Sequence, residues 1–89
     1  MVSYASSLKS AVERQMVYPP DHSGKKCTAR VEQDQQGNVL QLQVTQCASV
    51  ELQRAVEQAI RRAAPLPLPS DKAHYERYLV LQFVVPRES

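Results

Sequence analysis

Two cysteines stand at the open ends of a predicted β-hairpin, and this pair constrains the fold of the chain more than any other feature. Strand-like residues run over 26–34 and again over 38–46, with a turn signal at 35–38 between them. If the tip is a two-residue loop at 36–37, antiparallel pairing brings Cys27 opposite the residue that precedes Cys47. The two sulfur atoms then lie within reach of a disulfide.

The same pairing sets Val31 opposite Leu42. Because strand side chains alternate between faces, Cys47 should point away from Cys27, so we expect a bulge or the start of the next helix to turn it around. A disulfide that closes a loop of about 20 residues contributes roughly 3 kcal/mol in the chain-entropy model. It also indicates an oxidising compartment, whereas the alternative is two unconnected buried thiols in a cytosolic protein.

Length and charge limit the function classes. The 89 residues can bury one core, so we expect residues 1–89 to form a single domain. The net charge of +2 is nearly neutral and the basic residues are scattered, which argues against nucleic-acid binding. No apolar run approaches the roughly 18 residues of a membrane span, so we expect no direct membrane insertion. The N-terminus also lacks the pattern of a signal peptide, so an exported domain would need an upstream segment that has been removed.

Hydrophobic periodicity predicts two helices. Apolar residues at i, i+4, i+7 and i+8 predict a helix over 3–16, capped by Ser3 and stopped by the tyrosine and two prolines at 18–20. A longer apolar stripe predicts a second helix that Ser49 caps and that ends near Ala63. Acidic residues near its start and arginines near its end suit the helix dipole.

The last third of the chain reads as a strap, a short turn and a strand. Alternating prolines predict an extended Pro-rich strap over 65–71, held to the core by its leucines. Ser70 and Asp71 can cap a short turn over 72–77, and a strand follows over 78–85.

This order of elements predicts an α+β fold. We expect a three-stranded antiparallel or mixed sheet, with helices packed on one face, in the order α-β-β-α-(short α)-β and with one disulfide. The second helix returns the chain along the sheet, so the third strand runs parallel to the second and antiparallel to a central first strand.

The final strand carries no charge, proline or glycine, although proteins usually protect an edge strand with such residues. Two interpretations stay open: the strand is central and buried, or it is an edge that accepts a partner's extended peptide as an added strand. The second interpretation predicts these partner-binding residues: Tyr75, Tyr78, Leu79, Val80, Leu81, Gln82, Phe83, Val84 and Val85. Tyr75 and the outer face of the hairpin are expected as secondary contacts, and packing of the Tyr75 ring against the strap is the alternative.

The sequence gives little support for a catalytic site or a metal site. An acid, an imidazole and a hydroxyl follow one another at 21–23, but sequence neighbours on a proline-led loop seldom point at a common atom. A metal site would need Cys27, Cys47, His22 and His74, which lack the paired short spacings of zinc ligands. We therefore expect no enzyme, no metal and no cofactor.

One set of segments extends in order along nearly the whole chain. It comprises Tyr18-Pro19, Gly24, the strand 27–31, the tip 34–39, the helix 51–63, the strap 64–69 and the closing residues 83–86. This set resembles the C-terminal family of TolA, and the tip, the helix and the Pro-Leu-Pro-Leu-Pro strap are its most specific part. The TonB C-terminal domain shares the Tyr-Pro pair and the glycine-containing tip, but the strap is more similar to TolA.

The resemblance implies a periplasmic protein-interaction domain of the Tol-Pal system, which supports outer-membrane integrity and cell division. The full-length protein would be anchored in the inner membrane by an N-terminal segment outside this sequence. The implied partners are TolB and Pal, together with colicin translocation domains and the filamentous phage minor coat protein. Two alternatives remain: a TonB-like energy-transducing domain that binds receptors, and a secreted inhibitor or accessory module on the same scaffold.

Overall fold

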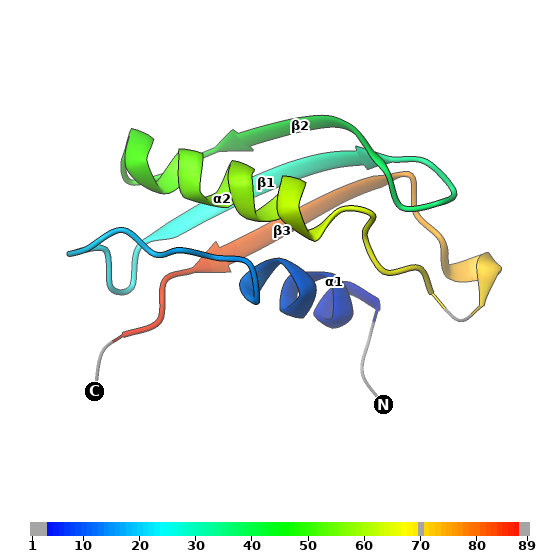
Figure 1. Cartoon of the computed structure of the whole chain (residues 1–89), viewed down its shortest axis with the longest axis horizontal. Helices are drawn as coiled ribbons and strands as arrows, with labels where there is room; N and C mark the ends of the chain where they lie inside the picture. Colours follow the sequence, from blue (N-terminus) through cyan, green and yellow to red (C-terminus); the bar gives the residue numbers. More distant parts are fainter. Residues whose placement is uncertain (1–3, 70, 88–89) are drawn as a thin grey trace.

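Two helices cover one face of a three-stranded sheet in the computed structural model, which describes residues 4–69 and 71–87 (Figure 1). The elements, in chain order, are α1 (Tyr4–Glu13), β1 (Lys26–Gln33), β2 (Val39–Thr45), α2 (Val50–Ala63), the 3₁₀ turn η1 (Lys72–His74) and β3 (Tyr78–Val84). Helix α2 packs over β1 and β2, while α1 contacts α2 and β3. The predicted α+β fold and the order of its elements are confirmed.

Strand β1 is the centre of the sheet. The strand order is β2-β1-β3, and both neighbours run antiparallel to β1. The predicted central first strand is therefore confirmed, and so is the parallel direction of the second and third strands. Side chains at alternate positions of β1 are buried under the helices, among them Cys27, Ala29 and Val31. They meet the apolar stripes of both helices in one core.

The helix boundaries follow capping chemistry. The Ser49 Oγ accepts the Leu52 N–H at 3.1 Å, so the predicted N-cap of α2 is confirmed. Helix α1 ends at Glu13, short of the predicted residue 16, because the N–H groups of Gln15 and Met16 bond three residues back in a tighter turn. The predicted cap Ser3 lies outside the described residues.

The hairpin keeps the predicted register but not the predicted tip. Val31 lies opposite Leu42, as expected, whereas the two-residue tip is wrong. The Asp34 N–H donates to the Asn38 carbonyl at 3.0 Å, which leaves a three-residue loop over 35–37. The pairing shifts by one residue next to Gln33, and this bulge restores the register of the strand bodies.

The Asp34 carboxylate organises the tip. Its Oδ1 accepts the backbone N–H groups of Gln36 and Asn38, each at 2.9 Å, and its Oδ2 accepts the Asn38 side chain at 3.0 Å. The bond from the Asn38 side chain is the largest cause that lowers the pKa of Asp34 below its ordinary value of 3.8, and the backbone bonds add to it.

Acid should loosen this tip. Because the folded-state pKa of Asp34 is depressed, its bonds stabilise the tip above the ordinary carboxyl pKa and are lost as the pH falls through the folded value. We expect the backbone amide signals of Gln36 and Asn38 to move in an NMR titration between about pH 5 and pH 2. The Asp34→Asn variant should lack this transition, and a wild-type tip whose signals stay in place would contradict the assignment.

The Pro-rich strap is clamped to the hairpin tip. The Leu66 N–H donates to the Gly37 carbonyl at 2.7 Å, and the Leu66 side chain is only 2 % exposed. Gly37 has φ +86°, and a Cβ there would lie 2.2 Å from the Leu66 carbonyl oxygen. Leu68 is 48 % exposed, so only one of the two leucines anchors the strap as predicted.

Replacing Gly37 by alanine should therefore separate the strap from the tip. We expect a loss of about 2 kcal/mol in the free energy of unfolding, measured by denaturant titration, from the left-handed backbone and the clash together. Gly24→Ala is the matched control, because φ is +77° there but a Cβ would meet only the Arg87 side chain, at 3.2 Å. Equal losses in the two variants would contradict a specific role for the clamp.

Candidate functional site

The open edge of the sheet lies along β3. In the described chain this strand pairs with β1 alone, which decides between the two interpretations of its sequence in favour of an edge. Leu79, Leu81 and Phe83 point into the core and are at most 5 % exposed. Tyr78 and Val80 point to the other face and are 71 % and 68 % exposed, so the edge is bordered by an apolar surface.

The direction of the backbone groups follows from two hydrogen bonds at the ends of the pairing. The Val85 N–H donates to the Lys25 carbonyl at 2.8 Å, and the Gln33 N–H donates to the Arg77 carbonyl at 2.9 Å. In an antiparallel pair, opposite residues alternate between those that exchange bonds and those that do not. The odd-numbered residues of β3 therefore bond to β1.

The even-numbered residues present their N–H and C=O groups to the open side. They are Tyr78, Val80, Gln82 and Val84. No hydrogen bond joins these backbone groups to another segment within residues 4–69 and 71–87. The predicted binding strand thus divides into four residues with available backbone groups and alternate residues that hold the strand to β1.

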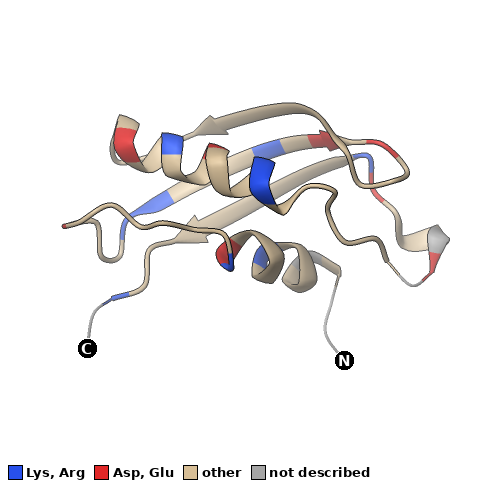
Figure 2. Cartoon of the chain, viewed as in Figure 1, with Lys and Arg blue, Asp and Glu red and all other residues tan. Residues whose placement is uncertain are grey.

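Charge does not protect this edge. Figure 2 shows no acidic or basic position along the β3 arrow. Arg77, which directly precedes β3, forms an ion pair with Glu32 of β1, with its Nε 2.7 Å from Oε2. The ion pair holds the Arg77 guanidinium beside β1. The guanidinium also lies 5.9 Å from the centre of the Tyr78 ring.

The opposite edge, along β2, has seven residues, as β3 does, but a bulge interrupts it. By the same alternation, the backbone groups of Leu42 and Val44 point outward there. The bulge interrupts the edge on one side, and Gln46, with φ +56°, ends it on the other. Bulges are ordinary protection against unwanted pairing, so β3 is the less protected of the two edges.

A buried amide fixes the start of β3. Gln33 is 0 % exposed, and its Nε2 donates to the Tyr4 hydroxyl and to the Glu76 carbonyl, both at 2.8 Å. The Tyr75 hydroxyl donates to the Gln33 carbonyl at 2.6 Å, so this predicted contact residue also has a structural bond. Sequence reasoning missed Gln33, although a polar residue in register with the inward side chains of β1 was the available signal.

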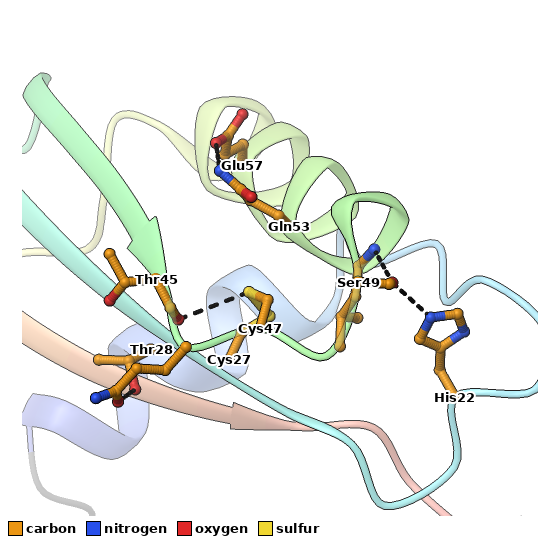
Figure 3. The surroundings of a disulfide bond; sticks show 10 residues. His22, Cys27, Thr28, Thr45, Cys47, Ser49, Gln53 and Glu57 are labelled. Atoms are coloured by element: carbon orange, nitrogen blue, oxygen red, sulfur yellow. Dashed lines mark hydrogen bonds between the residues drawn. A yellow bond between two sulfur atoms is a disulfide. The ribbon is translucent and has the colours of Figure 1, made fainter.

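The disulfide between Cys27 and Cys47 closes the other end of the hairpin (Figure 3). The predicted bridge is confirmed. We expected a bulge or the start of α2 to turn Cys47 towards Cys27, and this expectation is wrong. Gln46 adopts φ +56° and reverses the direction of the following residue.

His22 belongs to the cap of α2 and not to a catalytic triad. Its Nε2 lies 2.6 Å from the Ser49 Oγ (Figure 3). Its Nδ1 lies 2.6 Å from the Pro20 carbonyl oxygen. A carbonyl only accepts, so we assign the proton to Nδ1 and let the Ser49 hydroxyl donate to Nε2. The neighbours Asp21 and Ser23 form no bond with this ring.

The described residues offer no group of three acidic, histidine or cysteine side chains that could hold a metal ion. Because Cys27 and Cys47 are joined to each other, they present no thiolate. Neither of the described helices α1 and α2 has the length and hydrophobicity that crossing a membrane requires.

Comparison with known families identifies the scaffold. A family model described as TolA C-terminal matches residues 1–85. Among curated proteins, none is similar enough to this chain to count as a match.

Two solved structures share the fold. One is the solution structure of TolAIII bound to a peptide derived from the N-terminus of TolB, with a TM-score of 0.78 and 17 % identity over 96 % of this chain and 74 % of that chain. The other is the TonB C-terminal domain of Helicobacter pylori, with a TM-score of 0.65 and 16 % identity over 97 % of this chain and 94 % of that chain.

Proposed function

This chain belongs to the TolA C-terminal family, and from that premise we propose that it binds an extended peptide as a fourth strand along β3. The observation that carries the proposal is the row of outward backbone groups at Tyr78, Val80, Gln82 and Val84. A peptide in register would bond to all four residues. Its affinity would come from the backbone, and its selectivity from alternate side chains.

The exposed apolar side chains of β3 define what such a peptide should look like. Residues directly opposite one another in a sheet share a face, so peptide side chains across from Tyr78, Val80 and Val84 would cover their exposed surfaces. These three side chains are between 50 % and 71 % exposed. Aromatic or β-branched residues at alternate positions of the peptide would therefore bind best, and the half-buried ring of Tyr75 is the secondary contact in this proposal.

We propose TolB as the first partner, because the TolAIII structure that shares this fold holds a TolB peptide. Pal, colicin translocation domains and the filamentous phage minor coat protein are the further proposed partners, on the basis of family membership. The same basis supports a periplasmic location in a longer, inner-membrane-anchored protein of the Tol-Pal system. The disulfide supports this location, since such bonds persist in oxidising compartments.

NMR titration with a synthetic peptide from the TolB N-terminus tests the proposal. We expect the largest chemical-shift changes in the backbone amides of Tyr78, Val80, Gln82 and Val84, with smaller changes at the residues between them. Changes confined to α1 or α2 would contradict strand addition at β3. Capture of a hydrolase, with no TolB or Pal, would favour the alternative of an inhibitor on the same scaffold.

A further inference from the structure

A groove on the helical side of the molecule is separate from the β3 edge. It has a volume of about 490 Å³ and lies between α2 and the linker that follows α1. In Figure 1 this linker runs back past α2 towards the end where that helix begins. One wall is the extended segment 17–20, and the other is the exposed side of α2, so the groove is bounded by two unlike surfaces.

The linker wall is apolar and exposed. Val17 is 69 % exposed and Tyr18 is 38 % exposed, and Pro19 and Pro20 complete the wall. Partial burial, together with Glu13, raises the pKa of Tyr18 above its ordinary value, and the phenol, like any tyrosine hydroxyl near neutral pH, can donate a hydrogen bond to a ligand. An apolar side chain of a ligand would be sheltered against this wall.

The helical wall carries a row of three polar side chains, Arg54, Gln58 and Arg62, which we call the basic row. Figure 2 shows the basic positions of α2 in blue. Within residues 4–69 and 71–87, no ion pair involves Arg54 or Arg62, and Arg62 bonds only to the neighbouring Gln58, at 3.5 Å. Glu51 closes one end of the groove, so a ligand carboxylate would be favoured along the row and disfavoured beyond it.

The spacing of the basic row matches an extended chain. Residues four apart in a helix are separated by about 6 Å along the axis. Alternate residues of an extended strand are separated by about 6.6 Å and point to the same side. Three alternate residues of a ligand would therefore face Arg54, Gln58 and Arg62 in turn, while the two residues between them face the linker wall.

We propose that this groove is a second docking site, for an extended acidic segment of a partner protein with the pattern acidic, apolar, polar, apolar, acidic. The two carboxylates pair with Arg54 and Arg62, the central polar side chain bonds to Gln58, and the apolar side chains cover Val17 and Tyr18. The site is independent of β3, so the domain can hold two segments of a partner, or two partners, at once. Two sites on one domain raise the overall affinity for a partner that presents both segments.

The test uses the blocked peptide Gly-Glu-Val-Gln-Val-Glu-Gly and measures NMR chemical shifts. We expect saturable changes at the backbone amides of residues 17, 18, 54, 58 and 62. The same peptide with both glutamates replaced by lysine is the control, because it retains the capacity to add to β3 but should leave these amides in place. A glutamate peptide that shifts only β3 signals would overturn the proposal and leave the function of β3 intact.

A charge reversal identifies the arginines. The double variant Arg54→Glu and Arg62→Glu should weaken binding of the glutamate peptide by about tenfold, since two exposed charge pairs become repulsive. The variant Arg61→Glu, compared with the single variant Arg62→Glu, is the charge-matched control, because Arg61 lies on the same helix but does not line the groove. If the control weakens peptide binding equally, the peptide is attracted by the net charge of the domain alone, and the proposed site is overturned.

Vesicles of phosphatidylglycerol distinguish a membrane from a protein ligand. We expect them to leave the signals of the basic row and the linker wall unchanged. Stronger effects from the vesicles than from the peptide would assign the groove to a lipid surface and overturn the peptide proposal.

Discussion

The substitution Gln82→Pro should strongly weaken binding of the TolB N-terminal peptide while the domain stays folded. The Gln82 N–H points to the open side of β3 and takes no part in the pairing with β1. Proline removes this donor and places its ring where the incoming strand would lie. Edge strands tolerate proline at such positions, because the N–H that it removes faces solvent. We expect peptide affinity, measured by calorimetry, to fall by more than about tenfold, which corresponds to about 1.4 kcal/mol.

Alanine at the same position is the control for the side chain. Gln82→Ala retains the N–H, so its peptide affinity should stay within about twofold of the wild type if the backbone supplies the contact. Thermal unfolding should show that both variants remain folded. Strong peptide binding by the proline variant would rule out a strand added along this edge.

Reduction of the disulfide should produce the largest change in stability. The bond joins residues with a sequence separation of 20 and restricts the unfolded chain. In the chain-entropy model this contributes about 3 kcal/mol. A domain of this size shifts its melting temperature by about 4–8 °C per kcal/mol, so we expect a decrease of more than about 10 °C in calorimetry with a reductant.

The double variant Cys27→Ala and Cys47→Ala is the control for this measurement. It should melt at a low temperature with or without reductant, because it has no bond to break. A wild-type melting temperature that stays the same under reducing conditions would show that the bridge does not stabilise the domain. The reduced protein should still bind the peptide at a temperature where it is folded, because the disulfide affects stability and not the β3 edge.

The architecture was predictable from the sequence because the hydrophobic periodicity of each element is strong and because caps and prolines mark where the helices begin and end. The two helices and the three strands appear in the predicted order, and the cap at Ser49 forms as expected. The errors lie where a local bond overrides a common pattern. At the hairpin tip the Asp34 carboxylate holds a three-residue loop, and Gln46 turns the chain near the disulfide by adopting a positive φ.

The candidate site was predictable only in part. The absence of charge, proline and glycine marked β3, but the strand order that makes it an edge depends on contacts across the whole chain. The sequence also could not predict which backbone groups of β3 face the open side, since this depends on the register between β3 and β1. The groove between the linker and α2 gave no sequence signal, because its two walls lie more than thirty positions apart in the chain.

Amide hydrogen exchange with and without the TolB N-terminal peptide tests strand addition most directly. In the free domain we expect rapid exchange at Tyr78, Val80, Gln82 and Val84, and slow exchange at the intervening residues, whose N–H groups bond to β1. Bound peptide should slow exchange at the four outward amides, because each gains an acceptor. If the peptide binds and these four amides still exchange at their free rates, the partner lies elsewhere and strand addition at β3 is contradicted.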